Sequence, residues 1–327
     1  MDNFKLSNAS DLSKYLEINE DGEKFGEAII TISDLNQLES LESKYVIFGI
    51  PTILHTKSSF KVNSGNFESL LKKLLNTQNN QFNKANEVIV LGEIDMEPLQ
   101  IDLNKQKQSF ESNTEEINKI HEKVDNIIYE LATVIFDSGK VPIMLGGHIN
   151  NSLSIGKAIK SSTKKSINLF DLSPNMNFDF STKQETLVSV NYFDKDLIGK
   201  YYAFGLHKNN IAQKNFNVIS ASTQIDFKFY EDCLHLTTLD KCVKFKNSID
   251  FLNGKLGFRL DLKSIQGLSA NCEPSSGFSL RDIRTFMKIV RKEKIEFLHI
   301  CGFETCKEEI TSMMLSYLIS DFIRHDD

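Results

Sequence analysis

Residues 141–150 read Val-Pro-Ile-Met-Leu-Gly-Gly-His-Ile-Asn and carry the clearest indication of the fold class. Its first five residues are apolar without alternation, which is typical of a strand that helices cover on both faces. The Gly-Gly pair that follows permits a sharp turn and a close approach of the next helix. Polar residues come directly after the turn, at the place where open α/β sheets bind their ligands.

Short apolar runs of this kind recur along the chain and alternate with amphipathic patterns. The candidate strands are Tyr45–Ile50, Val88–Leu91, Val141–Leu145, Ile167–Asp171, Tyr201–Leu206, Cys233–Leu236, Leu256–Leu262 and Glu296–Cys301. The clearest helix follows a capping-box pair, Ser112 and Glu115, and keeps its apolar stripe as far as Ile135. Two more helices are expected, one from Ser279 onwards and one over 308–323. This alternation predicts a three-layer α/β/α sandwich around a mainly parallel sheet of about eight strands.

The composition is that of a globular protein. Of the 327 residues, 40% are hydrophobic and 25% are charged, which excludes disordered, collagenous and coiled-coil chains. The net charge of −6 gives no reason to expect a nucleic acid or a membrane as partner. No apolar run reaches the length of a signal peptide or a membrane span, so we expect a cytoplasmic protein with reduced cysteines. We also expect residues 1–327 to form one domain, with 1–44 as an N-terminal extension.

The motifs of common cofactor sites are absent, and three polar strand ends remain. The sequence contains no Gly-x-Gly-x-x-Gly after a strand, no phosphate-binding loop and no Gly-x-Ser-x-Gly nucleophile elbow. The polar strand ends are Gly-Gly-His-Ile-Asn at 146–150, Asp-Leu-Ser-Pro-Asn at 171–175 and Asp-Leu-Lys-Ser-Ile-Gln at 261–266. If the strands are parallel, these ends share one edge of the sheet and form a pocket there.

In order and spacing, these strand ends resemble the ureohydrolase family, which comprises arginase, agmatinase and formimidoylglutamase. That family carries the motifs Gly-Gly-Asp-His-Ser, Asp-Ala-His-x-Asp and Ser-x-Asp-x-Asp-x-x-Asp-Pro, which hold two manganese ions. The resemblance extends from about Val46 to Ile323 and includes the segments 46–51, 90–94 and 273–279. It implies an arginase-like fold, hydrolysis of C–N bonds in linear amidines and assembly into homo-oligomers.

The metal ligands of the family are mostly replaced. The six ligand positions of the family fall on Ile149, Asp171, Ser173, Asn175, Asp261 and Lys263. Two divalent ions need anionic ligands to offset their charge, and here only two carboxylates remain, while Lys263 adds a positive charge. We therefore expect no metal, and we expect the Lys263 ammonium to lie between Asp171 and Asp261 as a buried ion pair.

Other roles are open for single residues near these positions. His148 stands one place before a ligand position, so it is either a slipped metal ligand or a hydrogen-bonded loop histidine. Asp171 and Asp261 either share a pocket or cap loops. The glutamate that holds the guanidinium in arginases falls near Cys301, with Glu304 three residues later; Cys301 itself is expected to be a buried thiol.

These observations leave three hypotheses about function. The first is a pseudoenzyme with a binding, regulatory or assembly role, whose ligand is a small amidine or an amino-acid-like molecule. The second is an active formimidoylglutamase-like hydrolase with Mn²⁺ in a rebuilt site of His148, Asp171 and Asp261. The third is metal-free hydrolysis, with Asp171 or Asp261 as general base and Lys263 as electrostatic stabiliser.

Overall fold

The computed structural model describes residues 3–17, 22–55, 60–63, 65–97, 110–176, 197–268, 276–303 and 308–325. Within these ranges, residues 52–55, 60–63, 65–66 and 110–118 are described by their backbone.

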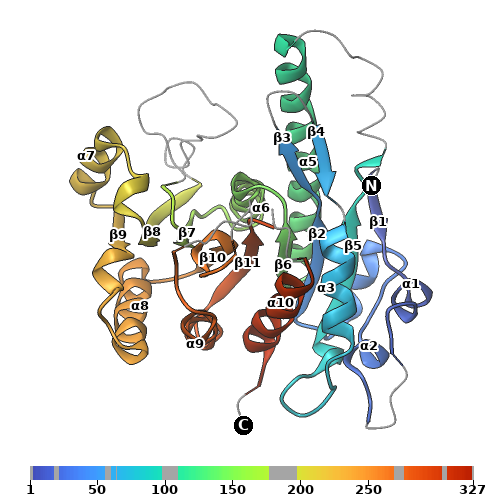
Figure 1. Cartoon of the computed structure of the whole chain (residues 1–327). Helices are drawn as coiled ribbons and strands as arrows, with labels where there is room; N and C mark the ends of the chain where they lie inside the picture. The colour runs from blue at the N-terminus through green and yellow to red at the C-terminus, as the bar shows by residue number, and fades with distance from the viewer. Residues whose placement is uncertain are drawn as a thin grey trace.

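A sheet of nine strands forms the centre of the molecule (Figure 1). Its order is β1-β5-β2-β6-β11-β10-β7-β8-β9, and every pair is parallel except β1 with β5. The strands are β1 (Phe4–Leu6), β2 (Tyr45–Ile50), β5 (Val88–Ile94), β6 (Val141–Gly146), β7 (Ile167–Leu172), β8 (Ile198–Leu206), β9 (Ile225–Phe229), β10 (Leu256–Asp261) and β11 (Ile295–Cys301). A separate hairpin consists of β3 (Thr52–His55) and β4 (Phe60–Asn63).

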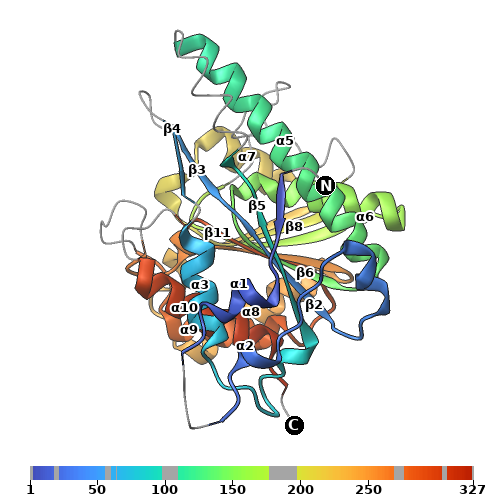
Figure 2. The ribbon, with the colours of Figure 1, turned by 90° about the vertical axis from the view of Figure 1, so that its right-hand side faces the viewer.

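Helices cover both faces of the sheet and complete three layers. One hydrophobic core joins the sheet to α3 (Gly65–Leu75), α8 (Thr238–Leu252), α9 (Leu280–Val290) and α10 (Glu308–Ile323). A second core joins the other face to α5 (Phe110–Asp137), α6 (Ser152–Thr163) and α7 (Gln213–Ala221). Two short helices, α1 (Ala9–Ser13) and α2 (Phe25–Ala28), precede β2. Figure 2 shows α5 extending beyond the sheet at the end where the β3–β4 hairpin lies.

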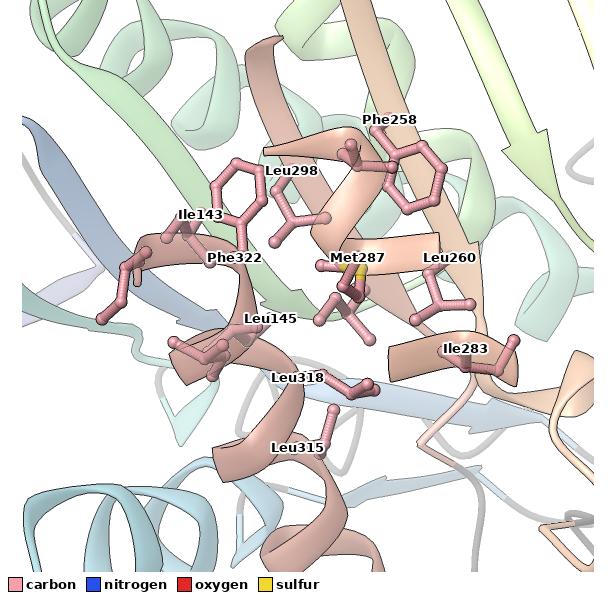
Figure 3. Close-up of a cluster of buried hydrophobic side chains, with 14 of the residues drawn as sticks. Ile143, Leu145, Phe258, Leu260, Ile283, Met287, Leu298, Leu315, Leu318 and Phe322 are labelled. Carbon is pink, nitrogen blue, oxygen red and sulfur yellow. The ribbon is translucent and has the colours of Figure 1, made fainter. Parts of the chain in front are cut away.

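Figure 3 shows the first core where β6, β10 and β11 meet α9 and α10. The labelled side chains are Ile143, Leu145, Phe258, Leu260, Ile283, Met287, Leu298, Leu315, Leu318 and Phe322. All of them are buried, and full burial of such a side chain contributes about 1.5–3 kcal/mol. None of the helices in the described ranges combines the length and apolar character needed to cross a membrane.

Stacked phenylalanines attach α8 and α9 to the sheet. The Phe245 ring of α8 lies parallel to Phe286 of α9, with ring centroids 4.3 Å apart and an interplanar angle of 2°. On its other side Phe245 contacts Phe170 of β7, at 4.8 Å, and Phe204 of β8, at 5.3 Å. Aromatic pairs of this kind contribute about 0.5–1.5 kcal/mol beyond the area they bury.

The predicted sandwich is confirmed, with two differences among the strands. Residues 233–236 are not a strand: Cys233 ends the 3-10 helix Glu231–Cys233, and its buried side chain fills the first core. The strand on this edge is β9, whose sequence Ile-Asp-Phe-Lys-Phe alternates and therefore differs from the continuous apolar runs. Residues 4–6, in the expected N-terminal extension, form the opposite edge strand.

Candidate site at the carboxyl ends of the strands

The candidate site lies where β6, β11, β10, β7 and β8 end side by side. Gly146 makes the turn after β6 possible, because its φ is +97° and a Cβ there would lie 2.1 Å from the Ile50 carbonyl oxygen. In the parallel register, Arg259 of β10 stands opposite Asp171 of β7 on one side and His299 of β11 on the other. All three side chains are completely buried, so each needs a polar partner inside the protein.

Arg259 and Asp171 form a bidentate ion pair in the interior. The Arg259 Nε atom lies 2.9 Å from Asp171 Oδ1, and Nη2 lies 2.5 Å from Oδ2. Tyr201 of β8 donates its hydroxyl to the same Oδ2 at 2.6 Å. On its far side, Arg259 Nη1 donates to the Ile149 carbonyl oxygen at 3.0 Å. The guanidinium thus connects β7 and β10 with the loop between β6 and α6.

His299 is neutral and fixed in one orientation. Its Nε2 lies 3.0 Å from the Gly146 carbonyl oxygen, and its Nδ1 lies 2.7 Å from Ser152 Oγ at the start of α6. Because a carbonyl oxygen accepts only, Nε2 carries the proton and Nδ1 accepts from the serine hydroxyl. Burial lowers the pKa of His299 to about 3, and the Arg259 charge acts in the same direction.

Asp261 is a second buried carboxylate, and it caps the 3-10 helix Leu262–Ser264. Its Oδ1 accepts the Lys263 backbone N–H at 2.9 Å, and its Oδ2 accepts the Ser173 hydroxyl at 3.2 Å. Burial raises the pKa of Asp261 to about 6, although these hydrogen bonds and the Lys263 charge oppose the shift. Gly302 packs so closely above it that a Cβ there would lie 2.5 Å from Asp261 Oδ1.

The ring of His148 caps the loop that follows β6. The ring Nδ1 accepts the Asn150 backbone N–H at 3.2 Å, and the His148 backbone N–H donates to Asn151 Oδ1 at 2.6 Å. The Asn151 amide in turn donates to Asp125 of α5 at 2.9 Å. Burial lowers the pKa of His148 to about 4, and the neighbouring His121, Arg259 and Lys263 lower it further.

The remaining sequence-predicted positions have structural partners or lie outside the described residues. Asn175 donates its backbone N–H to Ser173 Oγ at 3.3 Å. Cys301 is buried with its thiol toward the Leu260 carbonyl oxygen, and burial raises the pKa of this thiol well above its usual range. Glu304 lies outside the described residues.

The prediction about the buried cation needs correction. The Lys263 ammonium was expected between Asp171 and Asp261, whereas in the structure the ion-pair partner of Asp171 is the Arg259 guanidinium. The reason is position: Arg259 lies inside β10 directly opposite Asp171, while Lys263 comes after the strand has ended. The missed signal was an arginine within an otherwise apolar run, which requires a buried counter-ion.

Two manganese ions do not fit this arrangement of the described residues. A metal bound to Asp171 would have to displace Arg259, which would leave a buried guanidinium without its carboxylate. Across the part of the chain that the structure describes, no three His, Cys, Asp or Glu side chains are grouped so that they could hold a metal ion.

No family model and no curated protein matches the sequence, but solved structures do match the fold. The agmatine ureohydrolase of Thermoplasma volcanium is 18% identical, with 96% of each chain covered and a TM-score of 0.63. The formimidoylglutamase of Bacillus subtilis is 14% identical, with 96% of this chain and 97% of that chain covered and a TM-score of 0.67. The formiminoglutamase of Trypanosoma cruzi, solved with Mn²⁺, is 12% identical, with 92% and 99% covered and a TM-score of 0.62. Together with the polar strand ends, these matches confirm the predicted resemblance: the chain has the ureohydrolase fold.

Proposed function

We propose that this chain is a ureohydrolase-fold pseudoenzyme, which acts by binding rather than by manganese-dependent hydrolysis. The observation that carries the proposal is the buried ion pair of Arg259 and Asp171. Asp171 stands at one of the two ligand positions that still hold a carboxylate. Both of its oxygens are bound by Arg259, and one also accepts the hydroxyl of Tyr201.

Electrostatics makes this pair incompatible with a metal on the same carboxylate. A divalent ion bound to Asp171 would stand a few ångströms from the guanidinium, and the repulsion amounts to several kcal/mol at any reasonable local dielectric. Arg259 neutralises Asp171 and also binds the loop at Ile149. Its guanidinium therefore supplies the positive charge that a metal ion would supply at this position.

The alternative of a rebuilt manganese site receives less support. Of its three ligands, Asp171 is bound to Arg259, His148 uses Nδ1 to cap the loop, and Asp261 accepts two hydrogen bonds. The metal-free alternative has one observation in its favour, the raised pKa of the Asp261 carboxyl, which suits a general base near neutral pH. Loss of any detected turnover in Asp261→Asn would support that alternative.

A hydrolysis assay tests the proposal. The protein is incubated with agmatine, arginine and formimidoylglutamate, with and without Mn²⁺, and urea and formamide are measured. The formimidoylglutamase of Bacillus subtilis is the positive control for formimidoylglutamate. We expect no manganese-dependent product from this chain. Manganese-dependent release of urea or formamide that is lost in Asp171→Asn would overturn the proposal.

Three further parts of the interpretation stay predictions. They are the small amidine- or amino-acid-like ligand, the homo-oligomeric state and the cytoplasmic location. Multi-angle light scattering of the purified chain tests the oligomeric state, and a mass equal to that of one chain would contradict it.

A further inference from the structure

A cavity of about 280 Å³ opens at the opposite end of the sheet, among the amino ends of β2, β6 and β11. Its volume is close to the lower end of the roughly 300–1,000 Å³ that small-molecule sites have. Three cationic side chains from two segments line it: Lys44 before β2, and Arg291 and Lys294 between α9 and β11. This cavity takes no part in the proposed function and is separated from the candidate site by the length of the strands.

The carboxylates at the cavity already have partners. Glu293 is bound by Lys246 at 2.8 Å, and Glu296 is bound by Lys255 at 3.1 Å. By contrast, neither Lys44 nor Lys294 forms an ion pair with any residue that the structure describes. The cavity therefore concentrates positive charge in a chain whose net charge is −6.

The cavity also has an aromatic wall. Tyr45 and Phe322 line it with ring centroids 5.6 Å apart, and Lys44 Nζ lies 4.8 Å from the Tyr45 ring centroid. Arg291 is held in place by a 3.3 Å hydrogen bond from Nη1 to the Asp321 carbonyl oxygen near the end of α10. A guanidinium presents several donors in one plane and can bind phosphate while it keeps such a bond.

We propose that this cavity binds a small organic phosphate, with the phosphate charge between Lys44, Arg291 and Lys294. Another lysine-lined groove, with Lys157, Lys160 and Lys164, differs because its cations lie on a single helix and its carboxyl-terminal cap. Two of them, Lys160 and Lys164, lie at the carboxyl end of α6, where cations are favoured by the helix dipole alone. Convergence of cations from separate segments on an aromatic wall has no such local explanation.

Calorimetric titration of the full chain with inorganic pyrophosphate tests the proposal. We expect saturable binding that weakens about tenfold or more in the double variant Lys44→Gln, Lys294→Gln, because two charge-assisted contacts are lost. The matched control Lys157→Gln, Lys164→Gln removes the same charge elsewhere and should change the dissociation constant less than about twofold. Thermal unfolding of both variants verifies that they are folded.

Three results would overturn the proposal: no saturable binding to the unaltered chain, equal weakening in both double variants, or weakening in the control alone. If Lys44→Gln disturbs the contact with Tyr45 and the double variant does not fold, the single variant Lys294→Gln replaces it. Lys294 is exposed and forms no described side-chain bond, so this variant retains the test. The hydrolysis assay above does not depend on this outcome.

Discussion

The ion pair of Arg259 and Asp171 joins two completely buried side chains at the carboxyl ends of β10 and β7. A buried ion pair adds little stability compared with a well-packed apolar pair, but loss of one partner leaves an uncompensated charge. Asp171 has three hydrogen bonds from Arg259 and Tyr201, which satisfy its oxygens without an ion. The pair therefore connects β7 and β10 through their side chains as well as through the sheet.

Replacement of Arg259 by methionine should destabilise the protein by about 3–5 kcal/mol, because the Asp171 charge stays buried without its partner. The double variant Arg259→Met, Asp171→Leu should recover most of this loss. Urea denaturation measures the free energies of unfolding. Arg281→Met, at an exposed position, serves as the control and should change stability by less than about 0.5 kcal/mol. A loss below about 1 kcal/mol for Arg259→Met would show that the ion pair is not essential.

Glu93 near the end of β5 gives a pH dependence with a defined sign. Its Oε2 atom is buried and has no hydrogen-bond partner among the described residues, and burial raises the pKa of this carboxyl to about 7, against the opposing charge of Lys5. Because the pKa is higher in the folded than in the unfolded protein, the folded state binds the extra proton between the two values. The contribution of Glu93 to stability therefore falls as the pH rises from about 4.5 to 7.

In Glu93→Gln this dependence should disappear. Relative to the unaltered chain, the variant should gain about 2 kcal/mol between pH 4.5 and 7.5, a value that already discounts the partial exposure of the side chain. Urea denaturation at several pH values measures the difference. Glu97→Gln, at an exposed position after the same strand, is the control. A difference that does not change with pH would contradict the burial of an ionising Glu93.

Among the helices and strands, the sequence predicts those that carry a local signal, such as a continuous apolar run or a capping box. The bounds of β2 agree with the expected ones, because a continuous apolar run is a local signal. Those of α10 agree as well, although its apolar residues Ile310, Met313 and Tyr317 are exposed. The capping box at Ser279 and Asp282 likewise starts α9. The edge strand β9 was missed because one of its faces is partly exposed, so Asp226 and Lys228 interrupt the apolar run.

Local signals likewise predicted the positions of the two carboxylates in the candidate site, but not the ion-pair partner of Asp171. Strand ends identify Asp171 and Asp261 as neighbours at one edge of a parallel sheet, and the structure places both there. Which cation reaches Asp171 depends on the order of strands in the sheet, which puts β10 next to β7 although 83 residues separate Leu172 from Leu256. No pattern along the chain gives that order, so the partner role of Arg259 could not be assigned.

The attachment of α8 provides a test at this scale. Phe245→Ala should cost about 3–5 kcal/mol, because it removes a fully buried ring that contacts Phe170, Phe204 and Phe286. Val243→Ala on the exposed face of the same helix should change stability by less than about 0.5 kcal/mol. Urea denaturation of both variants measures these losses. Equal effects would contradict the packing of α8 through its phenylalanines.

For the molecule as a whole, the fold does not determine the chemical activity. A ureohydrolase fold is compatible with more than one activity, since the matching structures include an agmatine ureohydrolase and a formimidoylglutamase. The function of this chain therefore depends on the residues at its strand ends. There, the described side chains form a neutralised ion pair, a neutral histidine and a capped carboxylate.

The manganese content of the purified chain tests the proposed absence of a metal centre. The purified chain is incubated with excess Mn²⁺, passed through a desalting column and examined by inorganic mass spectrometry, with the formiminoglutamase of Trypanosoma cruzi treated in parallel. We expect fewer than about 0.2 manganese ions per chain, because Asp171 is already bound in an ion pair with Arg259. Retention of about two manganese ions per chain, as a binuclear hydrolytic centre requires, would contradict it.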